Sequence, residues 1–138
     1  MPYSLAAIGV ALALIIGGAV FFFTSQSDNS EVISMRGLHW HPSLEIYVKG
    51  VQQEIPEGIG LGAVHMPMHT HDDLPLIHLE FNGVVRSEDL ILGEFFKNWG
   101  RDMRSFGANM RMMVNGVENV EYENYLMHDG DKIQLFYD

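Results

Sequence analysis

The sequence predicts an α+β fold, in which a mixed sheet packs against one helix and follows an N-terminal transmembrane helix. Three observations carry this prediction. Residues 4–23 contain no charged side chain. Residues 39–49 and 76–81 alternate between apolar and polar side chains, which is typical of half-buried strands. Apolar residues between 92 and 99 recur at the spacing of an amphipathic helix.

The uncharged run near the N-terminus is long enough to cross a membrane. As a helix it would span roughly 30 Å, the thickness of a bilayer core. A cleaved secretory signal is the alternative, but no Lys or Arg precedes the run and no clear cleavage site follows it. The sequence therefore predicts a transmembrane anchor over residues 1–24, a polar linker over 25–34 and a His-rich domain over 35–138.

The charges around this run favour one orientation. Acidic residues follow it before the first arginine, Arg36, and this order favours a single-pass membrane protein with its domain on the extracytoplasmic side. The whole chain has a formal net charge of −10 and contains no cysteine. No nucleic-acid partner is expected, because nucleic-acid binding needs clustered positive charge. The lack of cysteine excludes disulfides, thiolate zinc sites and thiol catalysis.

The first half of the domain is predicted to form strands joined by loops. Residues 39–49 form the first strand, and a turn at Lys49-Gly50 leads to a short return strand over 52–55. Glycines and prolines make residues 56–75 irregular, and we expect a functional loop over 63–75. The strand over 76–81 follows, with its apolar and polar side chains on opposite faces.

The second half is predicted to contain the helix and the closing strands. The helix has its apolar stripe between Leu92 and Trp99, Ser87 as its N-terminal cap and Gly100 at its end. A strand over 110–114 leads into Asn115-Gly116, a pair typical of tight hairpin turns. A turn at Asp129-Gly130 precedes the last strand, over 132–137.

The closing segment Leu126-Met127-His128-Asp129-Gly130-Asp131-Lys132-Ile133 resembles the end of β-grasp domains, in which a similar "dgD-x-I" segment enters the last strand. That resemblance implies a β-grasp-like arrangement of the mixed sheet.

Histidines are the most informative residues of the chain. Five of the seven fall in two clusters, His39-Trp40-His41 and the segment from His65 to His71, and His78 follows in the next strand. Residues two apart on a strand share a face, so each His-x-His pair can project two imidazoles side by side. If the two histidine-bearing strands lie together, we expect His39, His41, His69, His71 and His78 to converge.

Dense imidazole and thioether groups are typical of a transition-metal site, with copper preferred and zinc as the alternative. The predicted metal ligands are His39, His41, His69 and His71, with His65, His78 and Met68 as additions. Asp72 and Glu80 are expected to orient imidazoles by hydrogen bonds. The alternative for the histidine pairs is aromatic packing or pH sensing, and for Met68 it is core filling. His128 is expected to be an ordinary surface or hydrogen-bonded core residue.

A set of short segments also has a resemblance. His39-Trp40-His41-Pro42, Ile55-Pro56-x-Gly58-Ile59-Gly60, His69-Thr70-His71-Asp72, Ile77-His78-Leu79-Glu80 and Leu92-Gly93-Glu94-Phe95-Phe96-x-x-Trp99-Gly100 occur in this order. Together they resemble a family of small secreted or membrane-anchored prokaryotic domains of unassigned function. The resemblance implies an extracytoplasmic domain with adjacent histidines and supplies no activity.

Three functions remain open from the sequence. The first is a metal-binding domain for storage, delivery or assembly. The second is a small mononuclear metalloenzyme, although the sequence contains no HExxH, GxSxG or phosphate-loop motif. The third is an accessory subunit with a membrane-protein partner, responsive to pH through its histidines.

Overall fold

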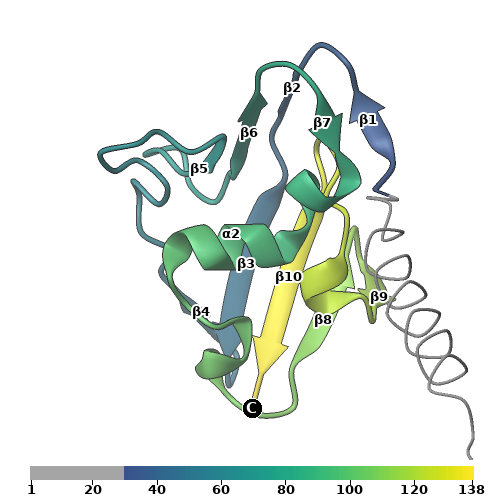
Figure 1. Cartoon of the computed structure of the whole chain (residues 1–138). Coiled ribbons are helices and arrows are strands. Elements are labelled where there is room, and N and C mark those ends of the chain that lie inside the picture. The colour runs from purple at the N-terminus through teal and green to yellow at the C-terminus, as the bar shows by residue number, and fades with distance from the viewer. Residues whose placement is uncertain (1–29) are drawn as a thin grey trace, which may run out of the picture. The chain divides into compact units, whose positions relative to one another are not determined.

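The computed structural model describes residues 30–138, and a compact unit spans Glu31–Asp138 (Figure 1). This part of the chain contains three sheets, one α-helix and three short 3-10 helices. The α-helix is α2 (Leu92–Trp99), and the 3-10 helices are η1 (Ser87–Leu90), η2 (Met103–Phe106) and η3 (Tyr122–Asn124). The expected α+β class is compatible with this mostly sheet architecture.

The largest sheet has five strands in the order β4-β3-β10-β8-β9. The central strand, β10, runs parallel to its neighbour β3, and every other neighbouring pair is antiparallel, so the sheet is mixed. Its strands are β3 (Ser43–Val48), β4 (Val51–Gln53), β8 (Arg111–Val114), β9 (Val117–Asn119) and β10 (Lys132–Tyr137).

The hydrophobic core lies between this sheet and α2, which crosses the sheet in Figure 1. Alternation along β3 buries Leu44 and Ile46, and the same period along β10 buries Ile133 and Leu135. The helical period of α2 buries Leu92, Phe95 and Phe96. Burying each such side chain stabilises the fold by about 1.5–3 kcal/mol.

The helix begins later than the sequence predicts. Ser87 starts the 3-10 helix η1 instead of capping α2, and the extended residue Ile91 separates the two. The carboxylate of Asp89 accepts a 2.8 Å hydrogen bond from the backbone N–H of Arg86, at the start of η1. Gly100 ends α2 in the left-handed conformation, with φ 69°.

The predicted strand over 39–49 is divided into two strands in different sheets. Pro42 lies at the break, and its missing N–H removes one hydrogen bond that a continuous ladder needs. The segment before the break is β2, which leads into β3 of the five-stranded sheet after it (Figure 1). The second sheet has the order β2-β6-β5, with β2 (Leu38–Trp40), β6 (His78–Phe81) and β5 (Met68–His69).

A third sheet pairs β1 (Val32–Ser34) with β7 (Val85–Arg86). Residues 32–34 were expected to belong to a polar linker, but Val32–Ser34 form strand β1. Their pairing partner lies more than fifty residues away in the sequence, which explains why local composition does not predict it.

The expected fold class needs one correction. It included a transmembrane helix, but no helix within residues 30–138 is long and apolar enough to cross a membrane. The predicted span over 1–24 lies outside the described residues. The architecture that the structure supports is therefore a mostly sheet domain with one short α-helix.

Candidate metal centre

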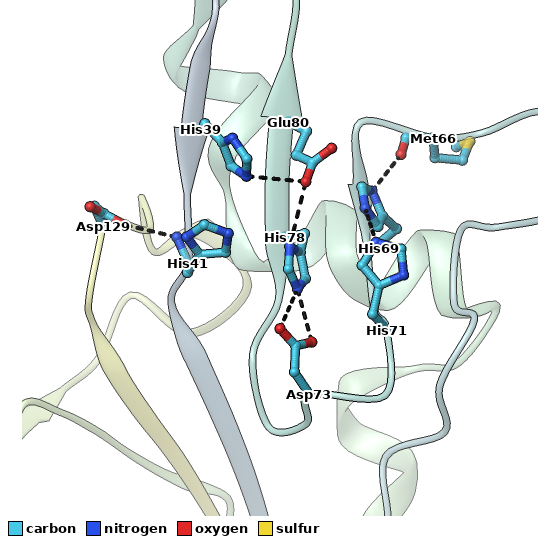
Figure 2. Close-up of polar contacts among 9 residues, drawn as sticks. All are labelled: His39, His41, Met66, His69, His71, Asp73, His78, Glu80 and Asp129. Carbon is cyan, nitrogen blue, oxygen red and sulfur yellow. Dashed lines mark hydrogen bonds and ion pairs between the residues drawn. The ribbon is translucent and has the colours of Figure 1, made fainter.

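The three-stranded sheet presents the clustered histidines on one face. Within it, His39 of β2 is opposite Glu80 of β6, and His69 of β5 is opposite His78 of β6. Because alternate residues of a strand share a face, the next histidine along each segment falls on the same side. Figure 2 shows the resulting group, which we call the histidine face: His39, His41, His69, His71, His78 and Glu80.

His78 is at the centre of the histidine face. Its ring centroid lies 4.7 Å from that of His41, 4.7 Å from that of His71 and 5.5 Å from that of His69. The rings of His39 and His41 are 4.7 Å apart. The two sequence clusters therefore meet in space, through antiparallel pairing of β2 and β5 on either side of β6.

His78 is held so that one ring nitrogen, Nδ1, makes no hydrogen bond within residues 30–138 and faces Glu80. Its Nε2 lies 2.9 Å and 3.0 Å from the two carboxylate oxygens of Asp73, which can only accept, so Nε2–H donates. A neutral ring then carries its lone pair on Nδ1. This buried atom has no hydrogen-bond partner among residues 30–138 and lies 3.5 Å from Oε1 of Glu80. A carboxylate holding the far nitrogen of an imidazole is the arrangement that orients metal-binding histidines.

His69 is oriented in a similar way. Its Nδ1 lies 2.9 Å from the carbonyl oxygen of Met66, which accepts, so the lone pair is on Nε2. That Nε2 is 3.1 Å from Nε2 of His71. Burial lowers the pKa of His69, which keeps the ring neutral and able to donate its lone pair to a metal ion.

The acidic groups beside the histidines remain ionised. Burial alone would raise the pKa of Glu80, but nearby His39, His69 and His78 lower it on balance. The hydrogen bond from His78 lowers the pKa of Asp73. Two anionic carboxylates beside the imidazoles favour a bound cation.

Two overlapping groups of side chains could hold a metal ion. In each group the potential ligand atoms all lie within 4.8 Å of one another. One group comes from β6 and the segment around β5, and consists of His69, His71, His78 and Glu80. The other comes from β6 and the segment around β2, and consists of His39, His41, His78 and Glu80. The two groups share His78 and Glu80. His69 and His78 are buried, whereas His39 is exposed, so the first group is the more enclosed.

The surrounding loops fix the position of β5. Gly60 has φ 75°, and a Cβ atom there would lie 2.6 Å from the carbonyl oxygen of Met68, so only glycine fits. The buried hydroxyl of Thr70 donates to the carbonyl oxygen of Pro56 at 3.0 Å. Asn98 of α2 donates to the carbonyl oxygen of Met68, also at 3.0 Å. Contacts with the glycine-rich segment over 56–62 therefore hold the second histidine cluster in position.

The last turn of the chain supports the other side of the histidine face. A carboxylate oxygen of Asp129 accepts a 2.8 Å hydrogen bond from the backbone N–H of His41. His128, in the same turn, stacks on Trp40 with ring centroids 6.0 Å apart. His128 belongs to neither ligand group.

Two other predicted ligands, His65 and Met68, are not members of these groups. His65 is exposed and its ring is 4.6 Å from that of His69, but it is in neither ligand group.

The carboxylate that contacts His78 is Asp73, whereas the sequence predicted that its neighbour Asp72 would orient an imidazole. The sequence contains only a weak indication, because Asp73 is separated from His78 by a turn that brings the two together.

Met68 lies in the hydrophobic core. It is only 2% exposed, and it pairs with Leu79 on the face of the sheet opposite His69. Since adjacent strand residues point to opposite faces, Met68 cannot share a ligand set with His69 without breaking β5.

This placement of Met68 makes a prediction. Met68→Leu should leave metal affinity unchanged and alter the free energy of unfolding by less than about 1.5 kcal/mol, since volume is conserved. Met68→Ala should lower that free energy by about 2–5 kcal/mol through the cavity it leaves. Urea unfolding and metal titration measure the two quantities, and a loss of affinity in Met68→Leu would contradict a core role.

An open pocket of about 770 Å³ adjoins the histidine face. Its lining includes His39, His65 and Glu80, together with Arg36 and the backbone around Gly37. Solvent and small molecules therefore reach the β2 side of the face more readily than the buried His69 side.

The chain was also compared with known proteins: no family model, curated protein or solved structure matches it. The resemblances noted in the sequence, the extracytoplasmic membrane location and the membrane-protein partner therefore stay predictions.

Proposed function

We propose that this protein binds a divalent transition-metal ion through His69, His71 and His78, with Glu80 as a fourth ligand. The observation that carries the proposal is the buried Nδ1 of His78, which has no hydrogen-bond partner within the described residues while Asp73 holds Nε2. Leaving such a buried atom without a hydrogen bond costs about 1–3 kcal/mol. A metal ion bound between Nδ1 and the Glu80 oxygen 3.5 Å away would remove that cost.

The donor set favours copper(II), with zinc(II) as the alternative. Imidazole suits both ions, and the general order of affinities for nitrogen and oxygen ligands places copper(II) above zinc(II). Thioether ligands, which would favour copper(I), receive no support because Met68 lies in the core. Copper(II) is therefore the first metal to test.

The exposure of the site suits metal exchange. Among the proposed ligands, the side chain of Glu80 is 39% exposed and His71 is half-buried, whereas His69 and His78 are buried. A purely structural metal site is normally closed by its protein ligands. An open edge supports a role in metal storage, delivery or assembly.

The proposal is tested by titrating the metal-free full chain with copper(II) and, separately, zinc(II), in competition with a chelator of known affinity. Saturable binding is expected, together with a higher melting temperature in the presence of metal, because a ligand that binds only the native state stabilises it. His128→Ala is the matched control, since it removes a histidine outside both groups, and it should bind as the wild type does. Binding of both ions only at the level of an unfolded chain would reject the proposal.

The role of Asp73 gives a second prediction. Asp73→Asn keeps the size of the side chain but replaces the carboxylate that holds Nε2 of His78. Loss of such an outer partner typically lowers metal affinity about 10–100-fold, and we expect a decrease in this range. The competition titration measures it, with Asp72→Asn as the adjacent control. Equal effects of the two substitutions would show that charge near the site, and not the contact to His78, is what matters.

A further inference from the structure

We infer that the histidine face holds two metal ions bridged by the carboxylate of Glu80. This inference rests on the proposed function. The first ion is the one held by His69, His71 and His78. The second is held by His39 and His41, at the exposed side of the same face.

The position of Glu80 is the main observation. Its Oε1 lies 3.1 Å from Nε2 of His39 and 3.5 Å from Nδ1 of His78. One oxygen therefore stands between a histidine of each half, as Figure 2 shows. Both halves can use the carboxylate at once only if it bridges two ions.

The number of donors gives the second observation. A four-coordinate ion needs four ligand atoms, but the histidine face supplies five imidazoles and a carboxylate. The two ligand groups overlap only in His78 and Glu80. If His78 binds the first ion, His39, His41 and one oxygen of Glu80 remain as a three-ligand set for the second.

The surroundings of the second set suit an ion with an exchangeable ligand. Three protein ligands with one open position are typical of metal sites that bind water or a small anion. His39 and Glu80 line the open pocket of about 770 Å³, so the open position would face solvent. Paired metal sites generally hold their ions about 3.5–4 Å apart, a separation that one bridging carboxylate spans.

The test combines stoichiometry and magnetic coupling in the full chain. Metal-free protein is titrated with copper(II) and examined by native mass spectrometry and electron paramagnetic resonance, with zinc(II) as a second metal for the mass measurement. Two ions per chain are expected. The resonance signal of the two-copper form should be weaker or split compared with two isolated ions, because the bridging carboxylate couples their spins.

The double variant His39→Ala/His41→Ala separates the two sites. We expect it to retain one ion and to show an uncoupled copper signal, whereas His128→Ala should retain both ions and the coupling. His39 is exposed, so its loss should leave the fold intact, and the coupling in the wild type tests the inference without any variant.

Each other outcome has a definite meaning. Saturation at one ion per chain would overturn the second site while leaving the proposed function standing. Two uncoupled ions in the wild type, or two ions in the double variant, would overturn the bridged arrangement. A failure to bind any ion would reject the proposed function itself, and with it this inference.

Discussion

Replacing His78 by alanine is expected to lower the affinity for the first metal ion by more than about 100-fold. Loss of an outer partner of a metal ligand costs about 10–100-fold, and loss of a central ligand should cost more. His78 belongs to both ligand groups, and its ring contacts those of His41, His69 and His71. A chelator-competition titration with copper(II) measures the change.

The matched control for this variant is His65→Ala. His65 lies beside His69, with ring centroids 4.6 Å apart, yet it is outside both ligand groups. Its replacement should therefore leave the affinity nearly unchanged. Thermal unfolding of both metal-free variants shows whether each is folded. A folded His78→Ala variant with the affinity of the wild type would refute the ligand role of His78.

Periodicity predicted the parts of the site that depend on local geometry. The His-x-His spacing correctly placed His39 and His41 on one face, because strand side chains alternate whatever the strand pairs with. The same rule placed His78 and Glu80 together and opposite the buried Ile77 and Leu79. The amphipathic pattern of α2 and the turn at its terminal glycine were also recognisable, since both arise within a few residues.

Pairing between distant segments could not be deduced with the same certainty. That β2 and β5 flank β6 follows from contacts between residues tens of positions apart, so the convergence of the histidines was only a hypothesis. Strand β5 has two residues, too few to show an alternating pattern. Its formation is what turns Met68 into the core and His69 onto the histidine face.

Two residues show how a correct pattern can mislead. Pro42 lies within an alternating stretch that predicts one continuous strand. The chain passes from one sheet to another at this proline, which has no N–H to donate, and this divides the stretch into β2 and β3. Ser87 is a good capping residue, yet the chain forms a 3-10 turn there before α2 begins. Both outcomes depend on tertiary contacts that the local sequence does not contain.

Asp131→Ala is expected to lower the free energy of unfolding by about 3 kcal/mol, because it removes a buried carboxylate that accepts three hydrogen bonds. The Asp131 carboxylate accepts 2.8 Å hydrogen bonds from the Asn115 side chain, the Tyr125 hydroxyl and the backbone N–H of His128. Urea unfolding of the metal-free protein measures the loss. Asp72→Ala is the control, because Asp72 is exposed, and it should change stability by less than about 0.5 kcal/mol.

The pH dependence of this difference identifies its electrostatic origin. Burial raises the pKa of Asp131, but its hydrogen bonds lower the pKa below the usual value on balance. A carboxylate with a lowered folded-state pKa stabilises the protein above its unfolded pKa, about 3.9, and this contribution is lost as the pH falls through the folded value. The stability gap between wild type and Asp131→Ala should therefore be full at neutral pH and shrink below about pH 4. If the stability gap were independent of pH, the packing of the Asp131 side chain, and not its charged hydrogen bonds, would be what stabilises this turn. The same turn carries Asp129, which binds the backbone of His41.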